Sequence, residues 1–193
     1  MKQLSTEITK LLNKKSTTDF LNAARQFVTL LENSDLNQDK FYKDSHKALS
    51  ELYGTALNLE TVELIHSGPD SEFDEIDKNE LRKMNKNLIS NLGKDCFYWE
   101  VFDPTYTEEN EKPGQGGKIT DRELSQGWLV DDFADIYADL KEELGKIDQI
   151  RTDESIEDAL WQLKFGFNHH WGNHCINAMR ALHYLWYDGK VAM

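Results

Sequence analysis

Residues 155–187, SIEDALWQLKFGFNHHWGNHCINAMRALHYLWY, constrain the fold more than any other stretch of the chain. They hold three of its five tryptophans and four of its six histidines, and they contain no proline. On a helix that turns about 100° per residue, one face carries an apolar stripe from Ile156 to Leu185, and other large apolar side chains occupy the rest of the wheel. A helix that is apolar nearly all round is normally buried. We therefore predict one continuous, buried helix here.

The rest of the chain shows helical periodicity in five segments, near residues 4–15, 16–33, 37–59, 77–93 and 120–147. The expected helix starts are Asn37 and three pairs that resemble capping boxes: Ser16 with Asp19, Asp77 with Glu80, and Thr120 with Glu123. The expected stops are Asn33 and Gly93. The predicted fold class is all-α: a single domain over residues 1–193, with about six helices packed around the buried C-terminal helix.

Two segments depart from this pattern. Residues 96–102, CFYWEVF, are rich in aromatic and β-branched side chains, which favours a short extended segment over a further helical turn. Residues 103–119 hold prolines and glycines and show no period of either kind, so we expect a long mobile loop.

Charge and composition exclude several classes of function. With 35 acidic and 22 basic residues the net charge is -13, which disfavours nucleic acid and anionic membranes as partners. No apolar run approaches the roughly 20 residues of a membrane span, and the N-terminus does not resemble a signal peptide. Cys96 and Cys175 form neither a zinc motif nor a C-x-x-C pair. These features predict a soluble, cytoplasmic protein.

An acidic face is predicted on the helix at residues 120–147. Asp132, Asp135 and Asp139 recur at helical spacing, and Asp131 completes a D-D-x-x-D pattern found in the aspartate-rich motif of prenyl-diphosphate and terpene synthases. Such carboxylates can hold Mg²⁺ and, through it, a diphosphate. The chain is short for those enzymes and has no second aspartate-rich box, so a solvated acidic face is the preferred interpretation.

His170 and His174 form the second candidate cluster, because side chains at i and i+4 lie on one helix face. This spacing presents two imidazoles to a metal, but no Glu follows His170, which excludes the H-E-x-x-H protease motif. Further ligands would have to come from Asp132, Asp135 and Asp139. The preferred interpretation is that both imidazoles are buried, neutral and hydrogen-bonded. The alternative is a divalent metal held by these five residues, with no other cofactor expected.

Three segments together resemble a bacterial family, the domain of unknown function 5063. They are YWEVFDP at residues 98–104, DDFADIYADL at residues 131–140, and ALWQLKFGFNHHWGNHCINAMRALHYL at residues 159–185. The resemblance implies a small, soluble, single-domain bacterial protein without an assigned activity. It transfers no catalytic residue to this sequence.

Two classes of function follow from these features. The chain has no nucleophile elbow and no P-loop, which favours an interaction, scaffolding or small-ligand-binding domain whose partner is another protein, a small molecule or a second copy in a homodimer. The alternative is a metal-dependent enzyme, similar to a phosphohydrolase, that uses the Asp and His cluster.

Overall fold

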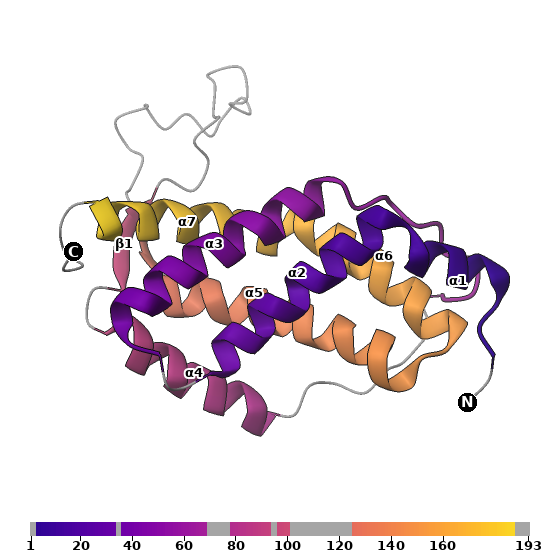
Figure 1. Ribbon diagram of the computed structural model, residues 1–193, viewed down its shortest axis with the longest axis horizontal. Coiled ribbons are helices and arrows are strands. Elements are labelled where there is room, and N and C mark those ends of the chain that lie inside the picture. Colours follow the sequence, from indigo (N-terminus) through magenta and orange to yellow (C-terminus); the bar gives the residue numbers. More distant parts are fainter. Residues whose placement is uncertain (1–2, 34–35, 69–77, 94–95, 101–124, 188–193) are drawn as a thin grey trace, which may run out of the picture.

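The computed structural model describes residues 3–33, 36–68, 78–93, 96–100 and 125–187. Within these ranges seven α-helices and one two-stranded sheet share a hydrophobic core, which confirms the predicted all-α fold. The molecule is elongated, with α1 near one end and the strand β1 near the other (Figure 1). The helices are α1 (Thr6–Asn13), α2 (Lys15–Glu32), α3 (Gln38–Leu57), α4 (Lys78–Leu92), α5 (Leu129–Gly145), α6 (Asp153–His169) and α7 (Trp171–Tyr187). The strands are β1 (Phe97–Glu100) and β2 (Ser125–Trp128), and the π-helical turn η3 (Lys146–Ile150) follows α5.

The boundaries of α2, α3 and α4 lie close to those predicted. Asn37 caps α3, because its side chain accepts a hydrogen bond of 2.8 Å from the backbone N–H of Lys40, and Asn33 ends α2. Gly93 ends α4 with a φ of 66°, a left-handed conformation that glycine adopts without strain. The predicted Asp77 cap lies outside the described residues.

The predicted capping box of Ser16 and Asp19 is wrong. Helix α2 begins at Lys15, directly after the end of α1, and its N-cap residue makes no side-chain cap bond. Asp19 instead pairs with Lys15 at 2.5 Å, one turn apart on the helix surface. The reason is that the extended backbone of the cap falls on Lys14, which makes no side-chain cap bond, so Ser16 already lies inside the first turn of α2.

The helix predicted for residues 120–147 begins later than expected. Residues 125–128 form β2, which pairs antiparallel with β1, so that Trp128 lies opposite Phe97 and Gly127 opposite Tyr98. This confirms the extended segment at residues 97–100 and corrects the prediction for residues 125–128. The pair of Thr120 and Glu123, and the predicted loop at residues 103–119, lie outside the described residues.

The C-terminal helix is interrupted, which corrects the prediction of one continuous helix. Helix α6 ends at His169, and His170 has φ and ψ angles of -143° and -90°, far from helical values. At Gly172 a Cβ atom would lie 2.1 Å from the backbone carbonyl oxygen of Phe167. Only glycine allows this approach of α6 and α7, so the break depends on Gly172.

The break also changes which side chains of α7 are buried. Its buried side chains are those of Trp171, Cys175, Ala178, Ala181, Leu182 and Leu185. His170 and His174 therefore do not lie within the core stripe, as a continuous helix would place them. They lie at the edge of α7 that faces α5.

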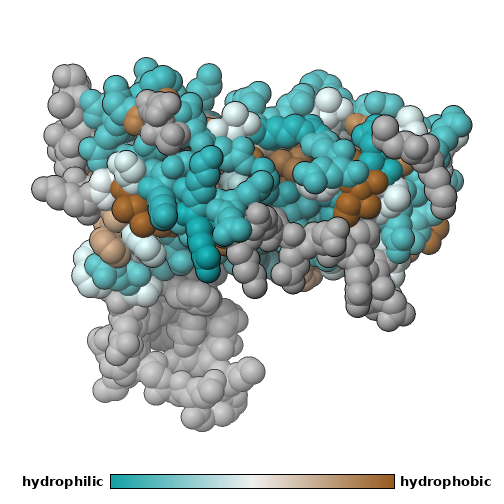
Figure 2. Space-filling view, turned by 90° about the horizontal axis from the view of Figure 1, so that it is seen from below, coloured by the Kyte–Doolittle hydropathy of each residue, from teal (hydrophilic) through white to brown (hydrophobic). Residues whose placement is uncertain are grey.

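The surface agrees with the acidic composition. Figure 2 shows a face that is mostly hydrophilic, with small separate hydrophobic areas. Among the described helices, none has both the length and the apolar character that a membrane span requires.

Candidate metal centre

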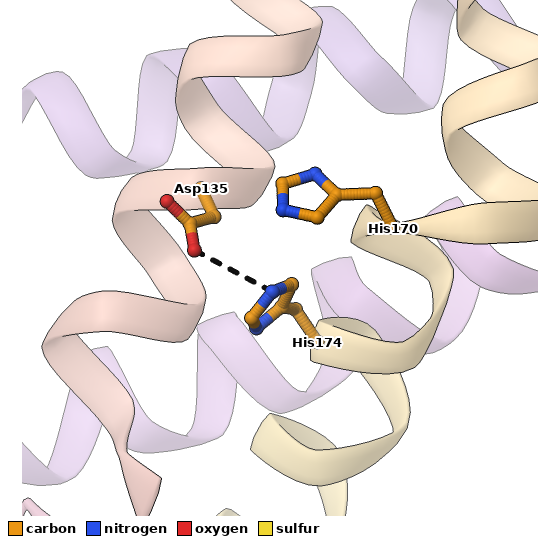
Figure 3. A group of neighbouring side chains, drawn as sticks. All are labelled: Asp135, His170 and His174. Carbon is orange, nitrogen blue, oxygen red and sulfur yellow. Dashed lines mark ion pairs between the residues drawn. The ribbon is translucent and has the colours of Figure 1, made fainter.

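The interface between α5 and α7 brings the two predicted clusters together. The two helices pack against each other, and α5 carries Asp132, Asp135 and Asp139 on the side that faces α7. His170 lies at the junction of α6 and α7, and His174 lies one turn further along α7. Figure 3 shows both imidazoles pointing across the interface toward Asp135.

Each histidine is held by one aspartate through its Nδ1 atom. The distance from His170 Nδ1 to Asp139 Oδ2 is 2.7 Å, and the distance from His174 Nδ1 to Asp132 Oδ1 is 2.8 Å. A carboxylate only accepts hydrogen bonds, so each ring donates its Nδ1–H. A neutral imidazole in this tautomer carries its lone pair on Nε2.

The remaining ligand atoms face a common point. His174 Nε2 lies 3.4 Å from Asp135 Oδ2, and one ligand atom each from Asp135, His170 and His174 lie within 4.8 Å of one another. Atoms bound about 2.0–2.1 Å from a tetrahedral zinc are about 3.3 Å apart, so the separation between His174 and Asp135 already suits a metal, and the other two, which are within 4.8 Å, need to contract by at most about 1.5 Å. Among the described residues, these three form a group that could hold a metal ion.

Burial and charge differ across the cluster. The side chain of Asp132 is 5% exposed and that of His174 22%, whereas that of His170 is 49% exposed and open to solvent. The hydrogen bond to Asp132 raises the pKa of His174, although burial opposes this shift. Burial also raises the pKa of Asp135, and the charge of His174 acts in the opposite direction.

The predicted site residues therefore fall into two groups. Asp135, His170 and His174 face the common point, and Asp132 and Asp139 stand behind the histidines. Asp131 is exposed to solvent, so the D-D-x-x-D pattern does not gather its three carboxylates at one point. The preferred interpretation of two buried histidines is wrong for His170, because the break before α7 places its ring at the surface.

Tyr98 is a member of the cluster that sequence reasoning missed. Its hydroxyl donates a 2.7 Å hydrogen bond to Asp132 Oδ2. Burial and this hydrogen bond raise the pKa of Tyr98, so the hydroxyl keeps its proton at neutral pH. The residue comes from β1 and is 34 positions from Asp132 in the sequence, so no helical spacing could have indicated the contact.

Comparison with family models decides the family. The model of the domain of unknown function DUF5063 matches residues 12–188, which is most of the chain. The chain belongs to the DUF5063 family. The predicted resemblance is thereby confirmed, and the family description names no reaction.

A solved structure resembles this DUF5063 chain in fold. The crystal structure of protein BF1032 from Bacteroides fragilis aligns with a TM-score of 0.74 and 24% sequence identity, over 95% of this chain and 99% of that chain. At this identity the likeness concerns the fold alone. No protein with a curated description matches the chain.

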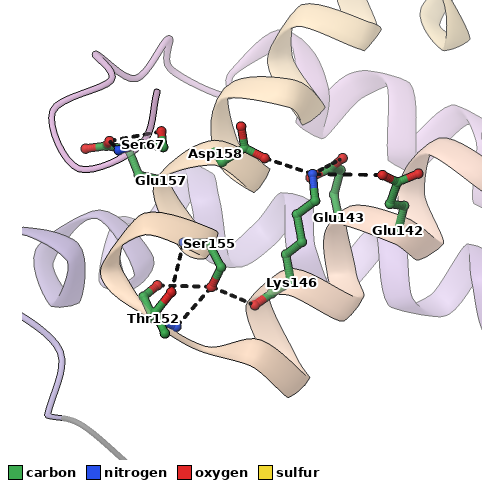
Figure 4. A network of polar contacts seen from close by, with 8 residues as sticks. All are labelled: Ser67, Glu142, Glu143, Lys146, Thr152, Ser155, Glu157 and Asp158. Atoms are coloured by element: carbon green, nitrogen blue, oxygen red, sulfur yellow. Dashed lines mark hydrogen bonds and ion pairs between the residues drawn. The ribbon is translucent and has the colours of Figure 1, made fainter. Parts of the chain in front are cut away.

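A second buried polar cluster of the DUF5063 chain lies where α5 passes into η3. Lys146, whose side chain is 6% exposed, lies 3.0 Å from Glu143 and 2.8 Å from Asp158 (Figure 4). Burial raises the pKa of Glu143 to about 8. Burial lowers the pKa of Lys146, but the hydrogen bond to Asp158 and the charge of Glu143 outweigh it, so the net shift is upward. No sequence motif marks these residues, although Glu143 and Lys146 stand at i, i+3.

The same figure shows a buried carboxylate that fastens a loop to α6. Glu157 Oε2 accepts hydrogen bonds from the backbone N–H groups of Ile65, His66 and Ser67, at 2.7, 2.6 and 2.8 Å. Figure 4 shows its contact with Ser67. Three backbone donors around one oxygen satisfy the buried charge. This contact is part of the structural framework and joins α6 to residues 65–67.

Proposed function

We propose that this chain binds a divalent transition-metal ion through Asp135, His170 and His174. The observation that carries the proposal is that both histidines donate Nδ1–H to an aspartate, while one ligand atom each from Asp135, His170 and His174 lie within 4.8 Å of one another. Histidines that bind metals in proteins are usually held in this way by a second carboxylate, which fixes the tautomer and makes the ring a better donor.

The ligand types select among metals. Two imidazole nitrogens and one carboxylate suit Zn²⁺, Fe²⁺ or Co²⁺ better than Mg²⁺ or Ca²⁺, which prefer oxygen ligands. Three protein ligands leave at least one coordination position for water or a small molecule. Because the His170 side chain is 49% exposed, solvent reaches this side of the site.

The charge around the site bears on its chemistry. Asp131, Asp132 and Asp139 lie near the three ligands, and their negative charges act on the pKa of Asp135 or of His174. A phosphate group at the metal would therefore also meet negatively charged carboxylates. This environment favours water or another neutral ligand at the open position over the substrate of a phosphohydrolase, the alternative that the sequence left open.

This proposal places metal binding ahead of the interaction or scaffolding role that the sequence alone favoured. The reason is that the packing of α5 against α7 brings the aspartates and the histidines together. Docking a partner does not require two histidines with fixed tautomers. A domain that binds a small ligand through the metal and a metal-dependent enzyme would both use this site. In both cases the metal must bind before the ligand or substrate.

A zinc titration of chelator-treated protein tests the proposal. We expect Zn²⁺ at 100 times its Kd to stabilise the fold by about 2.7 kcal/mol, seen as a rise in melting temperature. The variants His174→Gln and Asp135→Asn should lose most of the rise. His169→Gln is the matched control, because His169 is exposed and contacts Phe165 rather than the cluster. A wild-type protein without a chelator-reversible rise, or variants that keep it, would contradict the proposal.

A further inference from the structure

The two-stranded sheet of β1 and β2, called the β hairpin below, is hydrogen-bonded to both α5 and α7 beside the candidate metal centre. Tyr98 donates to Asp132 on α5 at 2.7 Å, and the side-chain amide of Asn177 on α7 donates to Glu100 Oε2 at 2.7 Å. The two contacts come from alternate residues of β1, whose side chains point to the same face of the strand. The hairpin therefore spans the α5–α7 interface beside the histidines.

Asp132 joins the hairpin to the site. One carboxylate oxygen accepts from Tyr98, and the other accepts from His174 Nδ1 at 2.8 Å. The Asp132 side chain is 5% exposed, so water does not readily replace either partner. With both oxygens bonded, the carboxylate has one orientation, and that orientation keeps the Nδ1–H tautomer of His174 and its Nε2 lone pair toward Asp135.

We infer that Tyr98 is a positioning residue of the metal centre, and that metal binding and hairpin docking are coupled through Asp132. The inference rests on the proposed metal binding. Removal of the Tyr98 hydroxyl leaves one oxygen of a buried carboxylate without a partner, and Asp132 then turns toward other donors and holds His174 less well. Partners of this kind typically contribute 10–100-fold to metal affinity.

The coupling acts in both directions. If the Tyr98–Asp132 contact strengthens metal binding by some factor, metal binding strengthens that contact by the same factor. The metal should therefore hold the hairpin more firmly against α5 and α7. Backbone amides of β1 and β2 are the direct reporters of this effect.

Gly127 is the residue that makes room for Tyr98. It lies opposite Tyr98 in the hairpin, and a Cβ atom at this position would lie 2.3 Å from Cζ and 2.6 Å from the hydroxyl oxygen of the Tyr98 ring. A methyl group at position 127 must therefore displace the ring from Asp132. This gives a second way to break the contact while the tyrosine hydroxyl is retained.

The main experiment compares Tyr98→Phe with Tyr137→Phe. Tyr137 is a matched control, because its hydroxyl donates to a carboxylate, Glu32, at 2.9 Å, and it does so from α5 itself but away from the histidines. Zn²⁺ affinity is measured by competition with a chelator of known affinity. We expect Tyr98→Phe to weaken binding by about 10–100-fold and Tyr137→Phe to leave it within about threefold of wild type.

Gly127→Ala provides the second variant, with Gly145→Ala as its control, because no atom lies within 4 Å of a Cβ at Gly145. Gly127→Ala should weaken Zn²⁺ binding as Tyr98→Phe does, and Gly145→Ala should not. In hydrogen exchange, Zn²⁺ should slow the amides of β1 and β2 in wild type about tenfold or more, and this slowing should be lost in Tyr98→Phe.

A readout without metal separates the two proposals. Nitrogen NMR of the His174 ring in metal-free protein, at a pH at which the ring is neutral, should show the Nδ1–H tautomer in wild type and a mixture in Tyr98→Phe. Wild-type protein that does not bind Zn²⁺ would overturn the proposed function, and the tautomer would still test the role of Tyr98. If wild type binds Zn²⁺ but Tyr98→Phe keeps both its affinity and the wild-type tautomer, the positioning role is wrong.

Discussion

Each histidine of the candidate metal centre depends on one aspartate for its orientation. His170 is paired with Asp139, and His174 with Asp132, while a carboxylate oxygen of Asp135 lies within 4.8 Å of a nitrogen of each ring. The sequence offered Asp132, Asp135 and Asp139 alike as partners of the two histidines. The structure makes Asp139 the direct hydrogen-bond partner of His170, so the pairing that a mutational experiment should address is Asp139 with His170.

A double-mutant cycle at this pair gives the residue-scale prediction. In metal-free protein at neutral pH, Asp139→Asn and His170→Gln should be non-additive by about 0.5 kcal/mol, a small value because both side chains are partly exposed and screened by solvent. The measurement is chemical denaturation in the presence of chelator. Asp139→Asn combined with His174→Gln is the control and should be additive, because His174 is hydrogen-bonded to Asp132. Additivity in both cycles would show that the 2.7 Å contact contributes nothing measurable to stability.

The break between α6 and α7 is the element that brings both histidines to α5. It depends on Gly172, where a Cβ atom would lie 2.1 Å from the carbonyl oxygen of Phe167. An added methyl group must therefore push the two helices apart at their junction.

Gly172→Ala tests this dependence. We expect a loss of about 1–3 kcal/mol in the free energy of unfolding, in the range of overpacked core sites, together with weaker Zn²⁺ binding. Gly54→Ala is the control, because Gly54 lies inside α3 with no atom within 4 Å of a Cβ, and this change should stabilise the protein by up to about 1 kcal/mol. Denaturant melting measures both. Equal effects at the two glycines would mean that the junction does not need a glycine.

The junction of α5 with η3 predicts a dependence of stability on pH. Burial raises the pKa of Glu143 from 4.5 to about 8, so the folded state holds a proton that the unfolded chain releases above pH 4.5. This contribution to stability is fully present below pH 4.5 and is lost as the pH rises toward 8. Each unit by which the pKa is displaced corresponds to about 1.4 kcal/mol in the free energy of unfolding.

In wild type the free energy of unfolding should fall between pH 5 and pH 8, and Glu143→Gln should remove part of this fall. Urea denaturation at several pH values measures it. Glu142→Gln is the matched control, because the Glu142 side chain is 42% exposed and lies 4.0 Å from Lys146, at the outer limit of an ion pair. A variant at Glu143 that keeps the wild-type slope would show that this carboxyl does not take up a proton on folding.

At the scale of the whole molecule, the net charge of -13 opposes the compact state through repulsion between carboxylates. Raising the ionic strength from about 0.01 M to 0.15 M shortens the Debye length from about 30 Å to 8 Å, so the melting temperature should rise. Differential scanning calorimetry measures this. The same salt series near pH 4.8, where the net charge is close to zero, is the control and should show little change. A melting temperature that falls with salt near neutral pH would mean that surface ion pairs outweigh the repulsion.

Much of the helical framework could be predicted from the sequence, because its signals act within one or two turns. Periodic apolar side chains located the helices, Asn37 and Gly93 marked two helix ends, and the aromatic run near Phe97 indicated a strand. The i, i+4 spacing of His170 and His174, and the recurrence of the aspartates on α5, also identified every side chain that the site brings together from these two helices.

Other features were decided only by the tertiary structure, because they depend on residues that are distant in the sequence. Strand β2 forms where helix was predicted, since its partner is β1, and Tyr98 reaches Asp132 only because that pairing places it there. Likewise, helical periodicity continues through His170, but the close approach of Gly172 to Phe167 breaks the helix. Residue spacing thus determined which groups could meet, and packing between distant elements decided that His170 lies at the surface, facing α5, rather than in the core.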